Sequence, residues 1–433
     1  MRSGLLLAAA GLAAVVAGPA AAAGRYRIDT FAGTGQPGSP TDVGDGLPAV
    51  RGFLDAPTGL ARDRRGNVYI ADHNHARVRR VRMRGPARII TTVVGTGEKG
   101  ADGDEGPASA ARLTLPTGVT VMRDGQLLIT DAGSDANANT VRRVDAKGLI
   151  HAFAGVGSVP PGDAGDGGPA TQALLATPLR TAVARNGDVY IVELNNHQVR
   201  VVRAADGSIH TVAGRGEPGD AGDGGPAVDA LLDQPAGLAL DRRRALYVAD
   251  FGNDRLRVVT PEGFIQALAG TGTRTGSIDG PGGDPHDDLG DDGPAAAATF
   301  FKPTGLAVER SGALLVADQG NSRIRRIAPD ADGALGPGSI VTTIIGNGTA
   351  GFGGDGGDAR AASLLIPTDV LPLPRGRLLI ADRGNNRLRI AVPVAAENLC
   401  RPGCTDGDPC TTDTCERETG CRHMPESRPS CLR

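Results

Sequence analysis

Six acidic residues recur at one position of a repeated pattern, each followed by an asparagine in most copies, and they are the residues best placed for chemistry. The set comprises Asp72 with Asn74, Asp131, Glu193 with Asn195, Asp250 with Asn253, Asp318 with Asn321, and Asp382 with Asn385. Short Asp and Asn side chains bond backbone N–H groups in tight turns, and an arginine such as Arg255 can reach the carboxylate of Asp250. Because the pattern recurs, we interpret it as turn stabilisation and, beyond that, as the candidate binding surface. No residue is assigned a catalytic role.

Gly- and Asp-rich runs separate these patterns, as in GDAGDGGPA from Gly162, and suggest calcium. Clustered carboxylates on flexible loops suit a hard, oxygen-seeking cation. The alternative is local: a proline opening a short helical turn that Asp or Gly caps, as between Asp166 and Leu175. The segment from Gly276 to Pro294 is the most acidic, and its candidate calcium ligands are Asp287, Asp288, Asp291 and Asp292. No cofactor is expected for the propeller, and calcium is left open on these loops.

The elements that position these residues come from a sixfold repeat. Its copies begin at Pro57, Pro116, Pro178, Pro235, Pro303 and Pro367. A second element, of the type ITTVVG, lies between the copies and begins at Ile28, Ile90, Ile150, Ile209, Ile265 and Val341. Each unit thus holds four short β-rich runs separated by turn residues, which predicts a four-stranded propeller blade and an all-β, six-bladed propeller.

The order of the pieces predicts a closed ring. The strand at Ile28 to Gly33 precedes the first copy, and no equivalent strand follows the last copy, which ends near Val392. If the first strand completes the last blade, the two ends of the propeller pair and leave no open edge. The turns after the second and fourth strands would then share one acidic face, opposite a face that carries arginines such as Arg62, Arg242 and Arg310.

The pattern of LYIAD, N-x-RIR-x-V and ITTVAG-x-G resembles the NHL repeat, and the GDGGPA connectors are similar to those of teneurin-type NHL propellers. The resemblance covers roughly residues 28–392 and implies a six-bladed propeller. For function it implies adhesion surfaces, RNA readers, lyases or assembly platforms, because one fold serves many functions.

An enzyme is the alternative that this resemblance raises. Propeller lyases hold a metal with several histidines near the axis, and zinc needs three or four convergent ligands. Here only His73, His75 and His197 fall in the turns of the acidic face, and they come from the first and third copies. Lactonase-type propellers use a central carboxylate and asparagine site for calcium, an idea that Glu193 keeps open.

Composition and charge narrow the partners. The 433 residues include Gly 65 and Pro 30, with 3% aromatic residues, no Trp and a net charge of -3. A nucleic-acid ligand is therefore not expected, since it would favour a basic, aromatic-bearing surface. Residues 1–23 have a charged start, an apolar centre and small residues at the end, which predicts a signal peptide rather than a membrane anchor. We expect no membrane span in the mature chain.

All cysteines lie at the C-terminus, at Cys400, Cys404, Cys410, Cys415, Cys421 and Cys431. In an exported chain, an even set within so short a segment predicts a disulfide framework, with zinc binding as the alternative. The DGDPCTTDTC segment resembles the cysteine-rich repeats of extracellular proteins of social microbes. The expected domains are a signal peptide at 1–23, the propeller at 24–397 and a disulfide module at 398–433.

These observations together predict a secreted, non-enzymatic binding or scaffold propeller with an extracellular protein or glycan partner. The alternative is a metal-dependent propeller enzyme of lyase or lactonase type, with its site at the acidic face.

Overall fold

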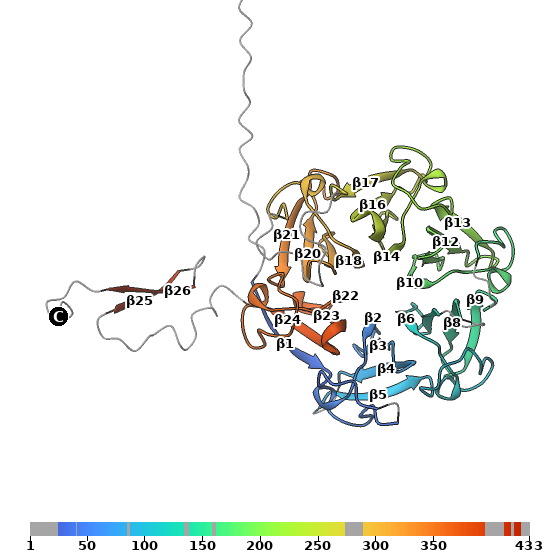
Figure 1. Cartoon of the computed structure of the whole chain (residues 1–433), viewed down its shortest axis with the longest axis horizontal. Coiled ribbons are helices and arrows are strands. Elements are labelled where there is room, and N and C mark those ends of the chain that lie inside the picture. Colours follow the sequence, from blue (N-terminus) through green and yellow to red (C-terminus); the bar gives the residue numbers. More distant parts are fainter. Residues whose placement is uncertain are drawn as a thin grey trace, which may run out of the picture.

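The computed structural model describes residues 25–39, 41–84, 87–133, 138–157, 162–272 and 289–394, and the backbone of 411–416 and 420–425. The described residues between 25 and 394 form six four-stranded antiparallel sheets, the blades, arranged in a ring around a central channel (Figure 1). The predicted all-β, six-bladed propeller is therefore confirmed.

Each blade is a meander of four strands. The first strands line the channel: β2 (Pro57–Arg62), β6 (Pro116–Val121), β10 (Pro178–Val183), β14 (Pro235–Leu240), β18 (Pro303–Val308) and β22 (Pro367–Pro372). The second strands are β3 (Val68–Asp72), β7 (Leu127–Asp131), β11 (Val189–Glu193), β15 (Leu246–Asp250), β19 (Leu314–Asp318) and β23 (Leu378–Asp382). The third strands are β4 (Arg77–Arg82), β8 (Thr140–Val144), β12 (Gln198–Val202), β16 (Arg255–Val259), β20 (Arg323–Ala328) and β24 (Arg387–Pro393). The fourth, outermost strands are β5 (Ile89–Val94), β9 (Ile150–Ala154), β13 (Ile209–Ala213), β17 (Ile265–Ala269), β21 (Ile340–Ile345) and β1 (Tyr26–Ala32).

The ring closes as predicted, by pairing of the two ends of the propeller. Strand β1 lies antiparallel to β24 with Tyr26 opposite Pro393, Ile28 opposite Ala391 and Ala32 opposite Leu388. The sixth blade therefore has the order β1-β24-β23-β22. Because its outer strand comes from the start of the propeller, the last blade cannot separate from the first without breaking this sheet.

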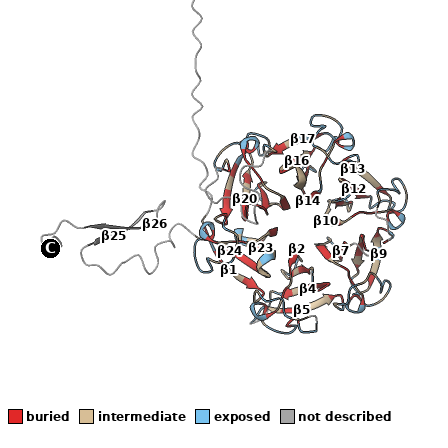
Figure 2. Ribbon diagram, viewed as in Figure 1, coloured by how far each residue is buried: buried red, intermediate tan, exposed pale blue. Residues whose placement is uncertain are grey.

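The apolar core lies between neighbouring blades rather than within one of them. In β3, Val68 and Ile70 belong to a cluster shared with the sixth blade, whereas Tyr69 packs on a cluster shared with the second blade. Both faces of the strand are thus buried, which explains why the second strands are nearly continuous apolar runs. Figure 2 shows the buried residues concentrated in the strands and the exposed ones in the peripheral loops.

The connectors between blades cover the free edges of the outermost strands. In the third blade, the N–H of Gly167 donates to the carbonyl of Ile209 and that of Ala170 donates to the carbonyl of Gly207. Each connector then forms a 3-10 turn: η1 (Ala49–Arg51), η2 (Ala108–Ala110), η3 (Ala170–Gln172), η4 (Ala227–Asp229), η6 (Ala295–Ala297) and η7 (Ala359–Ala361). Edge strands that are paired in this way are not available to other chains.

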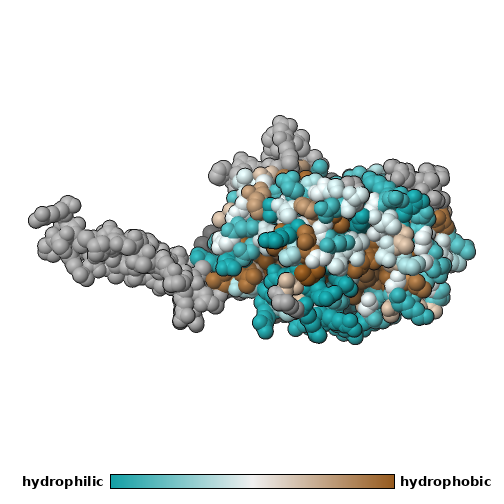
Figure 3. Space-filling view, turned by 90° about the horizontal axis from the view of Figure 1, so that it is seen from below, coloured by the Kyte–Doolittle hydropathy of each residue, from teal (hydrophilic) through white to brown (hydrophobic). Residues whose placement is uncertain are grey.

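Two expectations about the connectors need correction. In η3 the proline stands at the N-cap without any side-chain cap, and Asp166 instead bonds the Arg200 side chain and the N–H of Thr211. The connectors also do not stay on one face. They begin beside the second-to-third turns and then run along the rim. In the third blade the connector reaches Gly207, which lies in the third-to-fourth turn on the opposite face. Figure 3 shows hydrophobic residues in separate patches among hydrophilic ones on the side of the molecule that it displays.

At the C-terminus, β25 (Thr411–Glu416) and β26 (Gly420–Pro425) form an antiparallel hairpin in which Cys415 stands opposite Cys421. The cysteine side chains lie outside the described residues, as does the segment 1–23. No helix in the described part of the chain combines the length and apolar character needed to cross a membrane.

Candidate functional site

A buried ion-pair unit lies beneath each turn between the second and third strands. In the fourth blade, Asp250 accepts hydrogen bonds from the N–H of Asp233 at 2.8 Å, from Asn253 Nδ2 at 2.9 Å and from Arg257 Nη1 at 3.3 Å. Arg257 also bonds Asp223 and two connector carbonyls. Its side chain is completely buried. This unit ties two strands and a connector together.

The same unit recurs around the ring. The buried arginines are Arg79, Arg142, Arg200, Arg257, Arg325 and Arg389. Each pairs with a connector aspartate, namely Asp45, Asp104, Asp166, Asp223, Asp291 and Asp355 respectively. One aspartate of each connector is therefore paired with a buried cation, which reduces the negative charge of the face that the sequence marks as strongly acidic.

The six predicted carboxylates end the second strands and are fully buried: Asp72, Asp131, Glu193, Asp250, Asp318 and Asp382. Burial raises the pKa of Asp131, Asp250 and Asp382 to about 6 and that of Glu193 to about 8. These carboxylates accept hydrogen bonds from backbone N–H groups of the connector. Such bonds agree with the interpretation that the carboxylates stabilise turns.

The predicted asparagines occupy two different positions. Those three residues after the carboxylate donate to it: Asn253, Asn321 and Asn385. In the first and third blades this position holds His75 and Asn196 instead. Asn74 and Asn195, one residue earlier, are exposed and bond Asp55 and Thr177. Of the predicted binding set, Asn195 alone lines the cavity described next. A binding role for the others stays a prediction.

One detail of the sequence interpretation is wrong. The arginine that reaches Asp250 is Arg257 rather than Arg255. Arg255 pairs with Asp220 at 3.1 Å and donates to the carbonyl of Thr271. Arg255 stands directly opposite Asp250 in the register, and Arg257 lies two residues further along the same face of β16.

A cavity of about 670 Å³ opens at the mouth of the channel, on the face that carries the second-to-third turns. Its wall includes the residue that directly follows each buried carboxylate: His73, Ala132, Leu194, Phe251, Gln319 and Arg383. Its lower part includes the second residue of each first strand: Thr58, Thr117, Leu179, Ala236, Thr304 and Thr368. We call this space the mouth cavity. Its volume is in the range of small-molecule sites.

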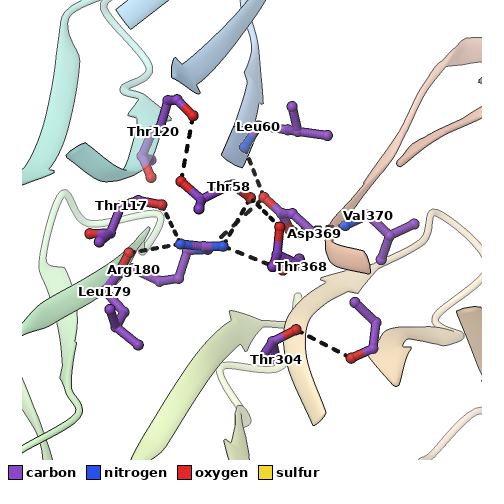
Figure 4. Close-up of polar contacts among 12 residues, drawn as sticks. Thr58, Leu60, Thr117, Thr120, Leu179, Arg180, Thr304, Thr368, Asp369 and Val370 are labelled. Atoms are coloured by element: carbon purple, nitrogen blue, oxygen red, sulfur yellow. Dashed lines mark hydrogen bonds and ion pairs between the residues drawn. The ribbon is translucent and has the colours of Figure 1, made fainter. Parts of the chain in front are cut away.

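The floor of the mouth cavity is a guanidinium group that spans the channel (Figure 4). Arg180 of the third blade donates to the carbonyls of Thr58, Thr117 and Thr368, in the first, second and sixth blades. Its Nε lies 4.0 Å from Asp369 Oδ2, in the blade opposite its own. Asp369 is held in turn by the N–H groups of Leu60 and Val370.

Arg180 and Asp369 occupy one position of the repeat. The other four blades have glycine there: Gly59, Gly118, Gly237 and Gly305. A Cβ on Gly237 would lie 1.8 Å from the carbonyl oxygen of Thr304, so the neighbouring first strands approach closely at these glycines. The two exceptions stand in opposite blades and carry opposite charges, which closes the channel below the mouth cavity.

Two titratable side chains in the wall are strongly affected by burial. Burial lowers the pKa of His73 to about 4, so the imidazole is neutral near pH 7, and its Nδ1 lies 3.1 Å from the carbonyl of Pro116. Burial also lowers the pKa of Arg383, helped by the charge of Arg180 and opposed by Asp55. The described lining of the mouth cavity contains no carboxylate.

The residues suggested for metal binding do not converge in the described structure. Among described residues, no group of three or more His, Cys, Asp and Glu side chains could hold a metal ion. Asp291 pairs with Arg325 at 2.8 Å, and Asp292 Oδ1 lies 3.3 Å from Thr342 Oγ1. Asp287 and Asp288 lie outside the described residues. His75 bonds Asp72 and His197 accepts the N–H of Gln234, so neither faces a shared site with His73.

Sequence reasoning considered His73 only as a candidate metal ligand, and it did not single out Arg180, Arg383 or the other four wall residues as a site. A signal was present in the repeat itself. Arg180 and Asp369 interrupt a column of glycines, and the position after each carboxylate changes chemical type from copy to copy. A position that varies among otherwise similar repeats is not required for the architecture.

Known proteins share both parts of the chain. Residues 403–425 match a family described as a Dictyostelium (slime mold) repeat. Teneurin-4 from Mus musculus is 29% identical over 298 residues, covering 60% of this chain and 10% of teneurin-4. NHL repeat-containing protein 2 from Bos taurus is 29% identical over 310 residues, covering 65% of this chain and 40% of that protein. The chain thus spans less than half the length of these relatives.

Solved structures agree on the fold. A protein of unknown function from Bacteroides thetaiotaomicron aligns with a TM-score of 0.58 and 14% identity, covering 85% of this chain and 76% of that chain. An auxiliary nutrient binding protein from the same organism aligns with a TM-score of 0.56 and 15% identity, covering 84% and 75%. The chain is a six-bladed β-propeller with NHL-repeat homologues, followed by a slime-mold-type repeat at its C-terminus.

Proposed function

We propose that this propeller is a binding protein whose ligand occupies the mouth cavity. The observation that carries the proposal is a contrast between two layers of the same repeat. Beneath the turns, all six blades keep a buried carboxylate and a buried arginine that pairs with a connector aspartate, whereas the wall residue directly above differs in every blade. Architecture accounts for the first layer, and selective binding accounts for the second.

The shape of the cavity supports this role. It is closed below by Arg180, so a ligand enters from the open mouth and stops at the guanidinium group. Its lining mixes apolar side chains such as Leu194 and Phe251 with a few polar ones, which is the usual composition of a small-molecule site. A protruding group of a protein or glycan partner would use the same space.

We also propose that the protein works outside the cell, as its N-terminal segment and its clustered cysteines predict. N-terminal sequencing of the protein recovered from its native host tests this directly. The proposal expects a mature chain that starts near residue 24, and an intact Met1 on the functional protein would contradict it.

The binding site is tested with two matched substitutions of glutamine. Gln319 lies in the wall of the mouth cavity, and Gln266 is an exposed residue of the outermost strand β17. The full chain is screened for thermal stabilisation by a small-molecule library, because a ligand that binds only the folded state raises the midpoint of unfolding. Confirmed ligands should lose affinity for Gln319→Trp and keep it for Gln266→Trp. Ligands that bind both variants equally well would place the binding site elsewhere.

A further inference from the structure

The mouth cavity has two chemically different sides. Its apolar lining comes from the second, third and fourth blades and consists of Leu115, Ala132, Leu179, Leu194, Ala236 and Phe251. Its charged and imidazole side chains are Arg383 of the sixth blade, His73 of the first, and Arg180, which reaches towards both of these blades from the third. A ligand that matches this cavity has a polar end and an apolar body.

The guanidinium of Arg180 already has acceptors and a carboxylate nearby. Its two Nη atoms donate to backbone carbonyls, including Thr58 O at 3.0 Å and Thr368 O at 3.3 Å, and Asp369 lies 4.0 Å from Nε. Arg180 therefore serves as a fixed floor of the mouth cavity.

The guanidinium of Arg383 differs in this respect. Within the part of the chain that the structure describes, its guanidinium has neither a hydrogen-bond acceptor nor a carboxylate within ion-pair distance. The charge of Asp55 opposes the lowering of the pKa of Arg383, and the Asp55 carboxylate already accepts a bond from Asn74. The donors of this partly buried guanidinium are therefore available to a ligand that enters the cavity.

His73 adds a second recognition element on the same side. The carbonyl of Pro116 can only accept, so the neutral imidazole carries its proton on Nδ1 and keeps a lone pair on Nε2. It contributes no positive charge of its own at neutral pH. The selectivity for charge on this side of the mouth cavity therefore depends on Arg383.

We propose that the ligand of the mouth cavity is a small organic anion, with a carboxylate paired to Arg383 and an apolar body packed against the side formed by Leu194 and Phe251. This inference rests on the proposed function, because it names the chemical class that the same cavity binds. Arginine suits such a group because its planar fork can bond both oxygens of a carboxylate.

The test compares 3-phenylpropionate with its uncharged analogue 3-phenylpropanamide, using calorimetry on the full chain. A charge-assisted pair contributes enough for the carboxylate to bind about tenfold or more tightly than the amide. Arg383→Gln should remove this preference, and Arg383→Lys should restore part of it. Arg64→Gln changes an exposed arginine on the opposite face and should leave the preference unchanged.

Three results would overturn the inference: equal affinity of the two probes for the unmodified chain, a preference that persists in Arg383→Gln, or no binding of the carboxylate up to about 10 mM. If both probes bind alike and both are lost in Gln319→Trp, the cavity stands as the site and the anion inference alone fails. If a carboxylate preference survives in Gln319→Trp, the anion binds elsewhere and the proposed function fails.

Discussion

The Arg180–Asp369 pair across the channel offers a quantitative test of how the floor of the mouth cavity is held. Both residues replace glycine, so Arg180→Gly and Asp369→Gly each restore the residue that four other blades use. Two opposite charges 4.0 Å apart attract by about 4 kcal/mol at an effective dielectric constant of 20. The side chains are only 15% and 12% exposed, so solvent screens this attraction in part.

Each single change leaves the other charge without its partner in the channel. Asp369→Gly leaves the Arg180 guanidinium in contact with carbonyls alone, and we expect a loss of about 2–3 kcal/mol in the free energy of unfolding. Arg180→Gly leaves the Asp369 carboxylate without a cation, although two backbone N–H groups still donate to it, and we expect a loss of about 1–2 kcal/mol in the free energy of unfolding. The double variant has neither charge, so it should be more stable than the sum of the two losses implies, by about 2 kcal/mol.

The assay is urea-induced unfolding of the full chain, followed by two independent spectroscopic probes so that the four proteins of the cycle are compared over the same transition. Losses that simply add in the double variant would refute the view that the two residues act as a pair. Single variants as stable as the unmodified chain would refute any structural role of the floor.

Four further outcomes follow from the structure. Gly237→Ala should destabilise the chain by several kcal/mol, about 3 or more, because its Cβ would meet the carbonyl of Thr304, whereas Gly336→Ala, which has free space around it, should change thermal stability little. Glu193 has a pKa raised to about 8 in the folded state against an ordinary 4.5, so its contribution favours folding below pH 4.5 and is lost as the pH rises towards 8; Glu193→Gln should therefore flatten the fall in stability between pH 6 and 8, and an unchanged slope would contradict this. Arg257→Leu removes the bonds to Asp250, Asp223 and two carbonyls and should cost about 3–5 kcal/mol in chemical unfolding, far more than Arg64→Leu on the surface. The tail should show no reactive thiol before reduction and all six cysteines after it in a mass-spectrometric thiol assay, and free thiols in the exported protein would argue for the zinc alternative.

The repeat made most of the architecture predictable from the sequence. The strands at Leu246–Asp250 and Arg255–Val259 were predicted correctly because short apolar runs between turn residues mark short strands. The single strand at Ile28, which precedes the first copy of the repeat, correctly predicted ring closure. These features depend on local pattern and on chain order, which a sequence displays directly.

The charges were harder to interpret. The acidic face was overestimated because the connector aspartates meet buried arginines far along the chain, as Asp166 meets Arg200 and Asp223 meets Arg257, each 34 residues apart. The repeated spacing was visible, but only the folded connector brings the two groups together. The same holds for Arg180 and Asp369, since a contact between opposite blades depends on the diameter of the closed ring.

The most direct test of the mouth cavity as the working site is a crystallographic fragment screen of the full chain. The cavity should collect more fragments than the grooves of the opposite face, such as the one lined by Arg185, Arg242 and Arg310, and bound carboxylates should lie against Arg383. An empty mouth cavity, with fragments gathered on the opposite face, would contradict the account.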